Sequence, residues 1–364
     1  MSLTRFLLAW RTTPLHDREV IDALVDPVHA APSPDLASAL REWPGSYYWS
    51  SEPDGRHLVL TRPSLKPREA WATHAALFLA TLFTTTMSGA IIVGALQPSL
   101  ELLLNPAAWT FAFFRALSSG FSFSIPLLAI LLCHELGHYL TARRYQLNVS
   151  PPFFIPSPPT PYGIGTFGAF IRLRTVLTDR RQLIDVGAAG PLAGFIVTVA
   201  VLWYGLAHSQ VVQSASNGMS VEGWGQTLGD SPLTLLLRRF THTDGGEVLL
   251  SPTALAGWFG VYVTLLNLLP IAQLDGGHIL YAVLPRFQRQ IGRAFWVLIV
   301  VLGYFSRSWL VWGVVVLLLS RGQFGHPPVL DAYRPLPKSR IWLFLASILL
   351  FVLTLIPIPL ADKP

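Results

Sequence analysis

A short motif inside a long apolar stretch combines residue types that bind metal ions and activate water. The motif reads His134-Glu135-Leu136-Gly137-His138. Two histidines four residues apart share one face of a helix, so both imidazoles can reach a single ion, and the intervening glutamate can act on a water at that ion. The motif therefore predicts a hydrolytic zinc centre, with His134 and His138 as ligands and Glu135 as the general base.

The apolar surroundings of this motif support the interpretation. Ionisable groups inside a membrane span cost on the order of several kcal/mol, and they persist where they pair, bind ions or face water. Here three of them lie within five residues, after an uncharged run that begins at Ala116. A polar contact between neighbouring helices, without a metal, is the alternative.

A zinc ion held by two histidines needs a third protein ligand and an open position for water. Asp275 is the candidate, because it ends an uncharged run that begins at Val248. Pro270 breaks the helix before it, and Gly276-Gly277 frees the backbone, so Asp275 can turn toward another helix. A helix-terminal aspartate near a turn, without a metal, is the alternative.

The composition indicates a membrane protein. Hydrophobic residues make up 52% of the 364 residues. Charged residues make up 13%, which is about half of the usual share in globular proteins. Several uncharged runs reach the roughly 20 residues that a helix needs to cross the hydrocarbon core. These runs cover residues 70–100, 186–221, 248–274 and 341–361.

The distribution of basic residues predicts the topology in the lipid bilayer. The formal net charge is +6, but the basic residues gather at the ends of apolar runs and not in a stripe with aromatics, which indicates no nucleic-acid partner. If the N-terminal region is cytosolic, a helical hairpin around Arg307 keeps the basic segments inside, whereas a single helix there would place Arg321 to Arg340 outside. We therefore expect seven spans, at 71–96, 122–145, 186–208, 253–275, two between 293 and 321, and 340–360.

The pairing of the two metal-ligand motifs resembles a known family. HELGH in one span, followed in a later span by N-x-x-P-x-x-x-x-D-G from Asn267 to Gly276, is similar to the site-2 protease family of intramembrane metalloproteases. The resemblance extends through Gly165–Ile171 and Gly187–Gly194 and covers about residues 122–285. This ordered combination is far more specific than HExxH alone.

The resemblance implies a catalytic core of three spans with one Zn²⁺ per chain, held by His134, His138 and Asp275, and with Glu135 as general base. It also implies that Asn267 holds the substrate or stabilises the oxyanion. The implied substrates are single-span membrane proteins, cut in or near their transmembrane segments during regulated proteolysis. The short loop at 207–252 and the C-terminal span leave no room for a PDZ or CBS domain, so we expect a compact form.

The predicted fold is an all-α polytopic bundle with a small polar head. Within this head, Tyr47–Trp49 and His57–Leu60 flank a turn at Pro53-Asp54-Gly55, which indicates a β-hairpin. The predicted parts are a cytosolic N-terminal region at 1–69, a membrane domain at 70–285 with its catalytic core at 122–285, and C-terminal spans at 286–364.

The predicted active site lies near the cytosolic side of the membrane. The basic pair begins at Arg143, only five positions after His138, which is roughly 8 Å at the rise of an α-helix. The resemblance places such a protein in the bacterial cytoplasmic membrane, with its active site open toward the cytosol.

A segment after a Pro-rich loop could receive the substrate. Phe167 and Ala169 alternate with Gly168 and Phe170, which favours a short β-like strand that re-enters the membrane. A substrate helix must unwind before its peptide bonds can be attacked, and an edge strand could hold it by β-augmentation. A loop that only packs is the alternative. The predicted substrate-binding residues are Gly165, Phe167, Gly168 and Phe170.

Two other functions remain open at this point. The chain could be a catalytically silent scaffold that binds membrane segments, although the intact ligand set and Glu135 speak against this. It could also be a cation transporter, since buried His, Glu and Asp line ion paths. A transporter needs further acids and histidines in neighbouring spans, but 71–96 offers only His74 and 186–208 only His208.

Overall fold

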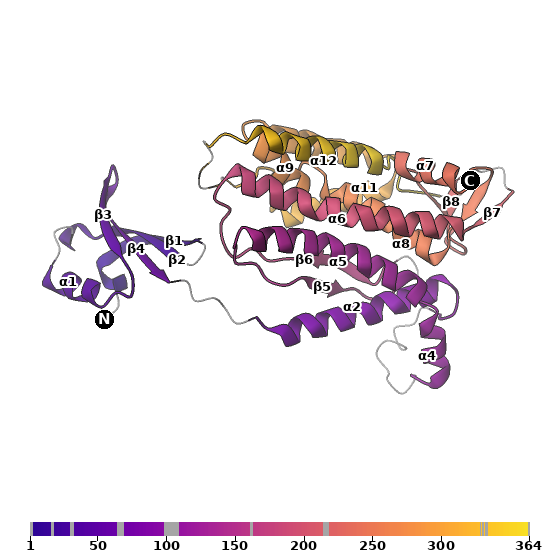
Figure 1. The fold of residues 1–364 in the computed structure, drawn as a ribbon, viewed down its shortest axis with the longest axis horizontal. Helices are drawn as coiled ribbons and strands as arrows, with labels where there is room; N and C mark the ends of the chain where they lie inside the picture. Colours follow the sequence, from indigo (N-terminus) through magenta and orange to yellow (C-terminus); the bar gives the residue numbers. More distant parts are fainter. Residues whose placement is uncertain are drawn as a thin grey trace.

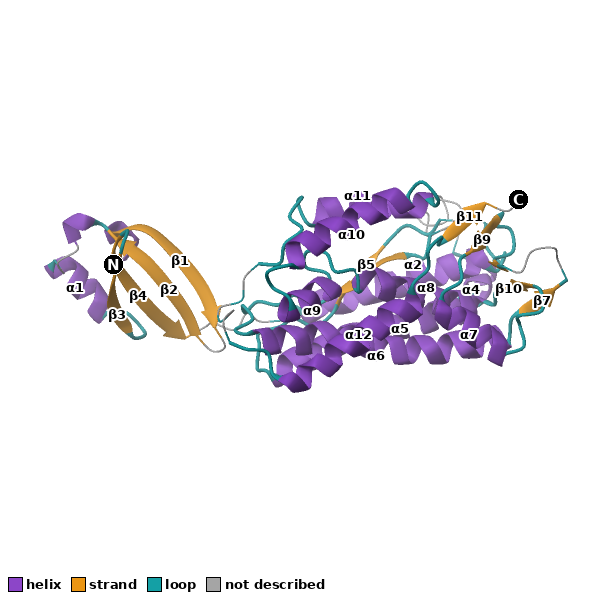
Figure 2. Cartoon of the chain, turned by 90° about the horizontal axis from the view of Figure 1, so that it is seen from above, coloured by secondary structure: helices purple, strands orange, loops and turns teal. Residues whose placement is uncertain are grey.

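In the computed structural model, the described residues form an N-terminal part with a four-stranded sheet and a helical domain that carries a five-stranded and a two-stranded sheet (Figure 1; Figure 2). The described residues are 3–15, 18–29, 33–63, 69–97, 109–160, 163–213, 218–327, 329, 331 and 334–362.

The N-terminal part is a four-stranded antiparallel sheet with its own hydrophobic core. Its order is β1-β2-β4-β3, and α1 (Pro34–Arg41) packs on it through Leu36, which is fully buried. The predicted hairpin is confirmed, since β3 and β4 pair around a turn in which Glu52 lies opposite Gly55. The strands are β1 (Leu7–Leu15), β2 (Arg18–Val25), β3 (Tyr47–Glu52) and β4 (Gly55–Pro63), with single 3₁₀ turns at Leu3–Phe6 and Pro27–His29.

Within the described residues, three helices are long and apolar enough to cross a membrane, and they occupy the first three predicted spans. They are α2 (Trp71–Ile92), α5 (Phe121–Arg144) and α6 (Arg180–Ala207), and the short α4 (Phe111–Ser118) leads into α5. A membrane-protein fold is therefore supported.

The remaining helices are shorter than the predicted spans. Their lengths are 16, 9, 15, 13 and 14 residues, whereas a full crossing needs about 20. The prediction of seven spans is thus not confirmed. The helices are α8 (Pro252–Asn267), α9 (Asp275–Val283), α10 (Gln288–Leu302), α11 (Arg307–Leu319) and α12 (Ile341–Thr354), with a 3₁₀ turn at Lys338–Arg340 before α12.

The stretch around Arg307 forms the predicted hairpin. Helix α10 ends at Leu302 and α11 begins at Arg307, and the two run antiparallel, since the Trp296 indole N–H donates to the Gly313 carbonyl at 3.0 Å. A single helix through this region is excluded.

The prediction of an all-α fold is wrong, because a second sheet forms from segments that are far apart in sequence. Its order is β11-β9-β8-β10-β7, and its buried Met219 and Val248 join the same hydrophobic core as Trp258 of α8. Burial of these apolar side chains favours the pairing of strands that are only two or three residues long. The strands are β7 (Gln210–Val212), β8 (Met219–Ser220), β9 (Gln226–Leu228), β10 (Glu247–Leu249) and β11 (Leu360–Asp362), with α7 (Pro232–Phe240) between β9 and β10.

The predicted β-like segment at residues 167–170 is confirmed as a short strand. Strand β6 (Thr166–Phe170) pairs antiparallel with β5 (Phe153–Pro156), and Leu173 makes only an isolated bridge to Val149.

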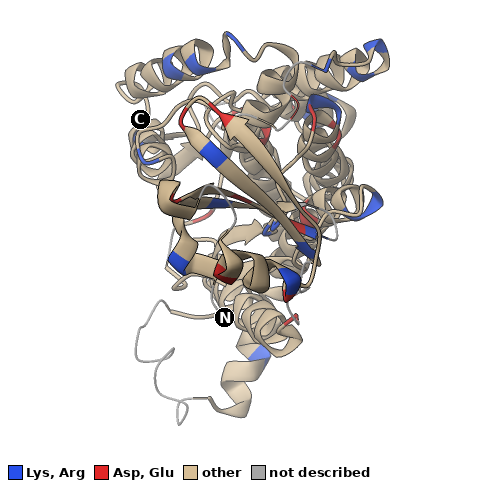
Figure 3. Cartoon of the chain, turned by 90° about the vertical axis from the view of Figure 1, so that its left-hand side faces the viewer, with Lys and Arg blue, Asp and Glu red and all other residues tan. Residues whose placement is uncertain are grey.

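The helical domain has two ends of different character. We call the end where α5 finishes at Arg143 and Arg144 the basic end, and the end that carries the five-stranded sheet the sheet end. Helices α5 and α8 both begin at the sheet end, where the Thr253 hydroxyl donates to the Ser122 carbonyl at 2.8 Å. Figure 3 shows Lys and Arg on both the N-terminal part and the helical domain.

Candidate metal centre

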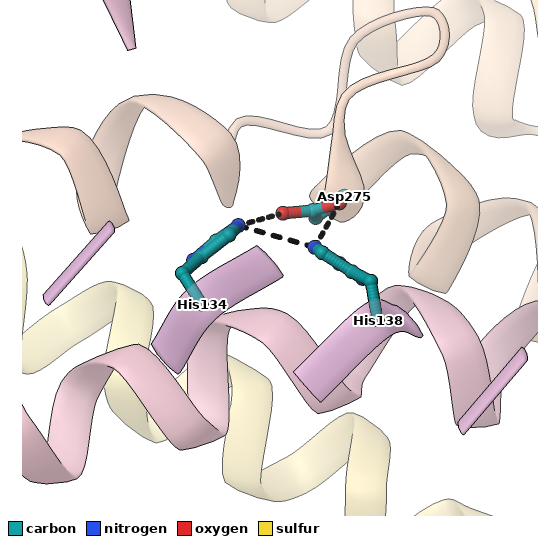
Figure 4. A group of neighbouring side chains, drawn as sticks. All are labelled: His134, His138 and Asp275. Carbon is teal, nitrogen blue, oxygen red and sulfur yellow. Dashed lines mark hydrogen bonds and ion pairs between the residues drawn. The ribbon is translucent and has the colours of Figure 1, made fainter. Parts of the chain in front are cut away.

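Helix α5 presents the three polar residues of its HELGH motif inside the protein. The side chains of His134, Glu135 and His138 are buried, and all three belong to one continuous helix of 24 residues. Because His134 and His138 are four residues apart, they project from the same face of α5 (Figure 4).

The third member of the group comes from the start of α9. Helix α8 ends at Asn267, the chain turns before Pro270, and α9 begins at Asp275, which faces both imidazoles (Figure 4). The two glycines that follow do not adopt unusual dihedral angles. Their lack of a side chain lets the start of α9 approach the backbone at the end of α8 closely, since a Cβ on Gly276 would lie 2.0 Å from the Leu268 carbonyl oxygen.

The distances within the group fit a tetrahedral metal ion. The Asp275 carboxylate oxygens lie 3.3 Å from the Nε2 atoms of His134 and His138, and these two nitrogens are 3.1 Å apart. Three ligands bound tetrahedrally at about 2.0–2.1 Å would have their atoms roughly 3.3 Å from one another. Two imidazole nitrogens and one carboxylate are also a donor set that zinc accepts.

The tautomer of one histidine is fixed by the backbone. The Nδ1–H of His138 donates to the Val186 carbonyl of α6 at 2.8 Å, which leaves the lone pair of Nε2 free to bind a metal. His138 is therefore oriented as a ligand by a contact that lies outside the motif.

Helix α6 can approach the centre because it carries small residues there. A Cβ on Gly190 would lie 2.0 Å from the His138 Nε2 atom, and one on Gly194 would lie 3.0 Å from the His134 Cβ. The spacing of Gly190 and Gly194 along α6 allows this close packing against α5. The direct contact of Gly190 with a ligand imidazole was missed, and the only signal for it was the spacing itself.

A groove of about 970 Å³ opens beside the metal centre. Its lining includes residues of α5, β6, α8 and the turn between α10 and α11, among them His134 and Glu135. Asn267 also lines the groove, and its Nδ2 atom is 3.4 Å from His134 Nε2.

The predicted substrate-binding residues do not all face this groove. Phe167, which is 76% exposed, and Gly168 line it. Gly165 instead packs on α2, where its carbonyl accepts from the Thr84 hydroxyl at 2.7 Å, and Phe170 stacks on Phe153. Sequence reasoning missed residues 304–308 as part of the groove lining, for which the only signal was Arg307 between two apolar runs.

The segment after α11 contacts the surroundings of the centre. His278 lies one turn beyond Asp275, and its Nδ1 is 2.7 Å from Nε2 of His326. The same segment also binds the turn before Asp275, since the Ala272 N–H donates a hydrogen bond to the Phe324 carbonyl at 3.2 Å.

The metal centre falls within a region shared with known proteins. The profile described as Peptidase family M50 matches residues 122–306. The chain is 32% identical over 238 residues to the probable zinc metalloprotease EGY1, chloroplastic, of Oryza sativa subsp. japonica, which is 64% of this chain and 39% of that protein. EGY1 of Arabidopsis thaliana is 31% identical over 239 residues, which is 64% of this chain and 42% of that protein.

A further relative matches over more of the chain. The probable zinc metalloprotease EGY2, chloroplastic, of Oryza sativa subsp. indica is 26% identical over 316 residues, which is 84% of this chain and 54% of that protein. The chain thus spans about half the length, or less, of these relatives. No solved structure matches the chain.

Proposed function

Because the chain belongs to peptidase family M50, we propose that it is an intramembrane zinc metalloendopeptidase that hydrolyses peptide bonds in or near transmembrane segments. The observation that carries this proposal is the placement of His134, His138 and Asp275 at ligand distances from one another, beside Glu135 and next to a groove that His134 and Glu135 line. The relatives named as probable zinc metalloproteases support zinc as the metal, one ion per chain.

The residues of the centre divide the chemistry between them. When bound, zinc would polarise the scissile carbonyl and acidify a water. Glu135 accepts the proton of the attacking water and then delivers it to the leaving amine. Asn267, whose amide lies beside His134, donates a hydrogen bond to the carbonyl oxygen as negative charge develops on it.

Strand β6 would hold the substrate in an extended form. A helix shields its peptide bonds by internal hydrogen bonds, so the substrate must unwind before attack. Strand β6 pairs on one side with β5, and residues 167–169 line the groove on the other. An unwound substrate can therefore add to this edge as a further strand, with one peptide bond beside Glu135.

The proposed substrates are single-span membrane proteins that are released by regulated proteolysis. The concentration of basic residues at the basic end, as in Arg143 and Arg144, supports a cytosolic position for that end and an active site open toward the cytosol. We propose the bacterial cytoplasmic membrane as its location, while the relatives EGY1 and EGY2 carry chloroplastic names.

Cleavage of a single-span reporter by the purified full chain in detergent with zinc tests the proposal. Glu135→Gln should lower the cleavage rate by about 10²- to 10⁴-fold, the usual contribution of a general base, with the zinc content by mass spectrometry unchanged. Glu222→Gln, an exposed glutamate of the sheet end, is the matched control and should cleave normally. Equal cleavage by Glu135→Gln would contradict the mechanism.

A further inference from the structure

The groove continues well beyond the metal centre, toward the sheet end. Besides β6 and α8, its lining includes Gln226 of β9, Leu360 of β11 and the turn at 304–308. These segments lie together, because the Ser306 hydroxyl donates to the Leu360 carbonyl at 2.9 Å and β11 pairs with β9. A substrate in the groove would therefore contact the protein at two places, the metal centre and the sheet end.

Among the described residues that line the groove, Arg307 is the only Lys or Arg, and it lies at this far end. Its side chain is exposed, and no acidic side chain in the described ranges forms an ion pair with it. Glu135, at the metal centre, is the one acidic residue among the described residues that line the groove. The groove thus presents a free cation at a distance from its catalytic carboxylate.

The backbone at Arg307 is fixed from both sides. Ser306 is bound to Leu360, and Trp309, which is 2% exposed, donates its indole N–H to the Pro357 carbonyl at 2.8 Å. Arg307 is also the first residue of α11, a helix of 13 residues, whose amino-terminal dipole adds positive potential at the same place. These contacts fix the backbone at Arg307 and so keep its guanidinium within reach of this part of the groove.

We propose that Arg307 selects substrates that carry an acidic side chain on the outer flank of their transmembrane segment. This inference rests on the proposed function and orientation, in which the sheet end faces outward. The acid pairs with the Arg307 guanidinium while the scissile bond lies beside Glu135. Arg307 is therefore a specificity-determining residue that takes no part in the chemical step.

The length of the groove limits the position of the acidic residue in the substrate sequence. Along α5, Glu135 lies about 20 Å from Ser122 at the sheet end, at roughly 1.5 Å per residue. A substrate that stays helical covers this distance in about 13 residues, and a fully extended one in about six. We expect the preferred acidic position between these limits, on the outer side of the scissile bond.

A lipid headgroup is the competing anion at this position. Tyr304 and Phe305 are 89% and 61% exposed in the same turn, and aromatic residues beside an arginine often anchor a protein at the membrane interface. The place of Arg307 in the groove that leads to Glu135 favours the substrate.

The test moves one acidic residue along a reporter. A set of single-span reporters carries Asp, Asn or Lys at each position from about six to 13 residues outside the scissile bond. In uncharged detergent, wild-type protein should cleave the best Asp reporter about three- to tenfold more efficiently than its Asn counterpart, through a lower KM and an unchanged kcat. The Lys reporter should be cleaved less efficiently than the Asn reporter.

A charge reversal provides the decisive comparison. Arg307→Glu should reverse the preference from Asp to Lys at the same position, and Arg307→Gln should abolish it. Arg293→Glu is the matched control, because Arg293 is an exposed arginine of α10 in the same hairpin but outside the groove, and it should keep the wild-type preference.

Three results would overturn the assignment. One is cleavage by wild-type protein that does not vary with the flanking charge, and another is an Asp preference that persists in Arg307→Glu. The third is a loss of cleavage in Arg307→Gln that is equal for all reporters and occurs only in vesicles with anionic lipid. This result would make Arg307 a lipid anchor. If cleavage still depends on Glu135 in any of these cases, the proposed function stands and only the role of Arg307 fails. If no reporter is cleaved in a Glu135-dependent way, both the proposed function and the role of Arg307 are contradicted.

Discussion

The imidazole of His138 is held between two elements of the fold. On one side its Nδ1–H donates to Val186, and on the other Gly190 leaves the space that the ring occupies. Both contacts come from α6, which contributes no ligand of its own. The metal affinity of the site therefore depends on how closely α6 can approach α5.

Replacing Gly190 by alanine should weaken metal binding without unfolding the protein. The added Cβ would lie 2.0 Å from His138 Nε2, so the ring must leave its ligand position. We expect a 10- to 100-fold lower zinc affinity, as is typical when the support of a ligand is lost. Competition with a chromophoric chelator measures it.

Gly194→Ala is the matched control for this prediction. Its Cβ would approach the His134 Cβ at 3.0 Å, which a small shift of α6 can relieve, so a smaller change in affinity is expected. Unchanged zinc affinity in Gly190→Ala would show that His138 can move and still bind the metal.

His57 forms a second polar cluster, in the N-terminal sheet. Its Nδ1 and Nε2 atoms lie 2.8 and 3.1 Å from Asp22 and Asp54, and the hydrogen bond to Asp22 is the main cause that raises the pKa of His57. A pKa raised in the folded state means that the protonated form stabilises the fold. This stabilisation is complete below the unfolded-state pKa of 6.5 and is lost as the pH rises through the folded-state pKa.

The N-terminal sheet should therefore be more stable near pH 6 than above about pH 8. Hydrogen exchange of β2 and β4 in the full chain, corrected for the intrinsic effect of pH, should show greater protection at the lower pH. His57→Gln should remove this difference, and His29→Gln, another histidine of the same sheet module, should retain it. A wild-type protein with equal protection at both values contradicts the role of His57.

At the residue scale, the sequence allowed the ligands to be predicted but not their surroundings. His134, Glu135 and His138 are adjacent in one helix, so their common face follows from helical spacing. The contact of Gly190 with His138 depends on how two helices pack, and helical spacing alone does not determine this.

At the scale of elements, β6 depends on a backbone conformation that only glycine adopts readily. Gly168 has φ of 102° and lines the groove, and a Cβ there would meet no neighbouring atom. Any cost of a side chain at this position therefore comes from the backbone and not from a collision.

Gly168→Ala should impair substrate binding more than stability. The strained dihedral costs about 1–2 kcal/mol, so β6 should relax and present a different edge to the substrate. We expect a higher KM for the reporter with unchanged zinc content, measured in detergent. Gly223→Ala, with φ of 78° and equal open space but outside the groove, should show a similar loss of thermal stability and normal kinetics. Equal kinetics of the two variants would argue against β6 as the substrate edge.

Helices were easier to predict than the second sheet, for a physical reason. Pro270 and the glycines after Asp275 mark the break between α8 and α9 locally, and Arg307 marks the hairpin. Strands β9 and β11 have three residues each and pair across more than a hundred residues of sequence, so no local pattern indicates them. Helix lengths were overestimated because an uncharged run can contain turns as well as helix.

At the scale of the whole molecule, the segment after α11 ties the last third of the chain to the catalytic helices. Gln288 of α10 is 1% exposed, and both ends of its amide bind this segment. Its Nε2 donates to the Phe324 carbonyl at 3.2 Å and its Oε1 accepts from the His326 N–H at 2.9 Å. Nearer α12, Arg340 forms an ion pair with Asp185 of α6.

Gln288→Leu should release this segment. The substitution keeps an apolar stem but leaves the Phe324 carbonyl without one donor and the His326 amide without its acceptor, at a cost of about 1–3 kcal/mol. Hydrogen exchange of peptides that cover residues 321–327 should become faster, while α2 stays protected. Gln290→Leu, an exposed glutamine of the same helix, should exchange like wild type. Unchanged exchange in Gln288→Leu would show that other contacts suffice.

The Phe324 carbonyl accepts hydrogen bonds from both Gln288 and Ala272, and the latter lies in the turn that delivers Asp275 to the metal. The ribosome makes His134 and His138 early, but the contact that fixes the turn before the third ligand requires residue 324. A partly synthesised chain would therefore already be in the membrane with two histidines and no completed metal site. Under the proposed function, we expect the nascent protein to stay inactive until residue 324 has been synthesised and has bound this turn.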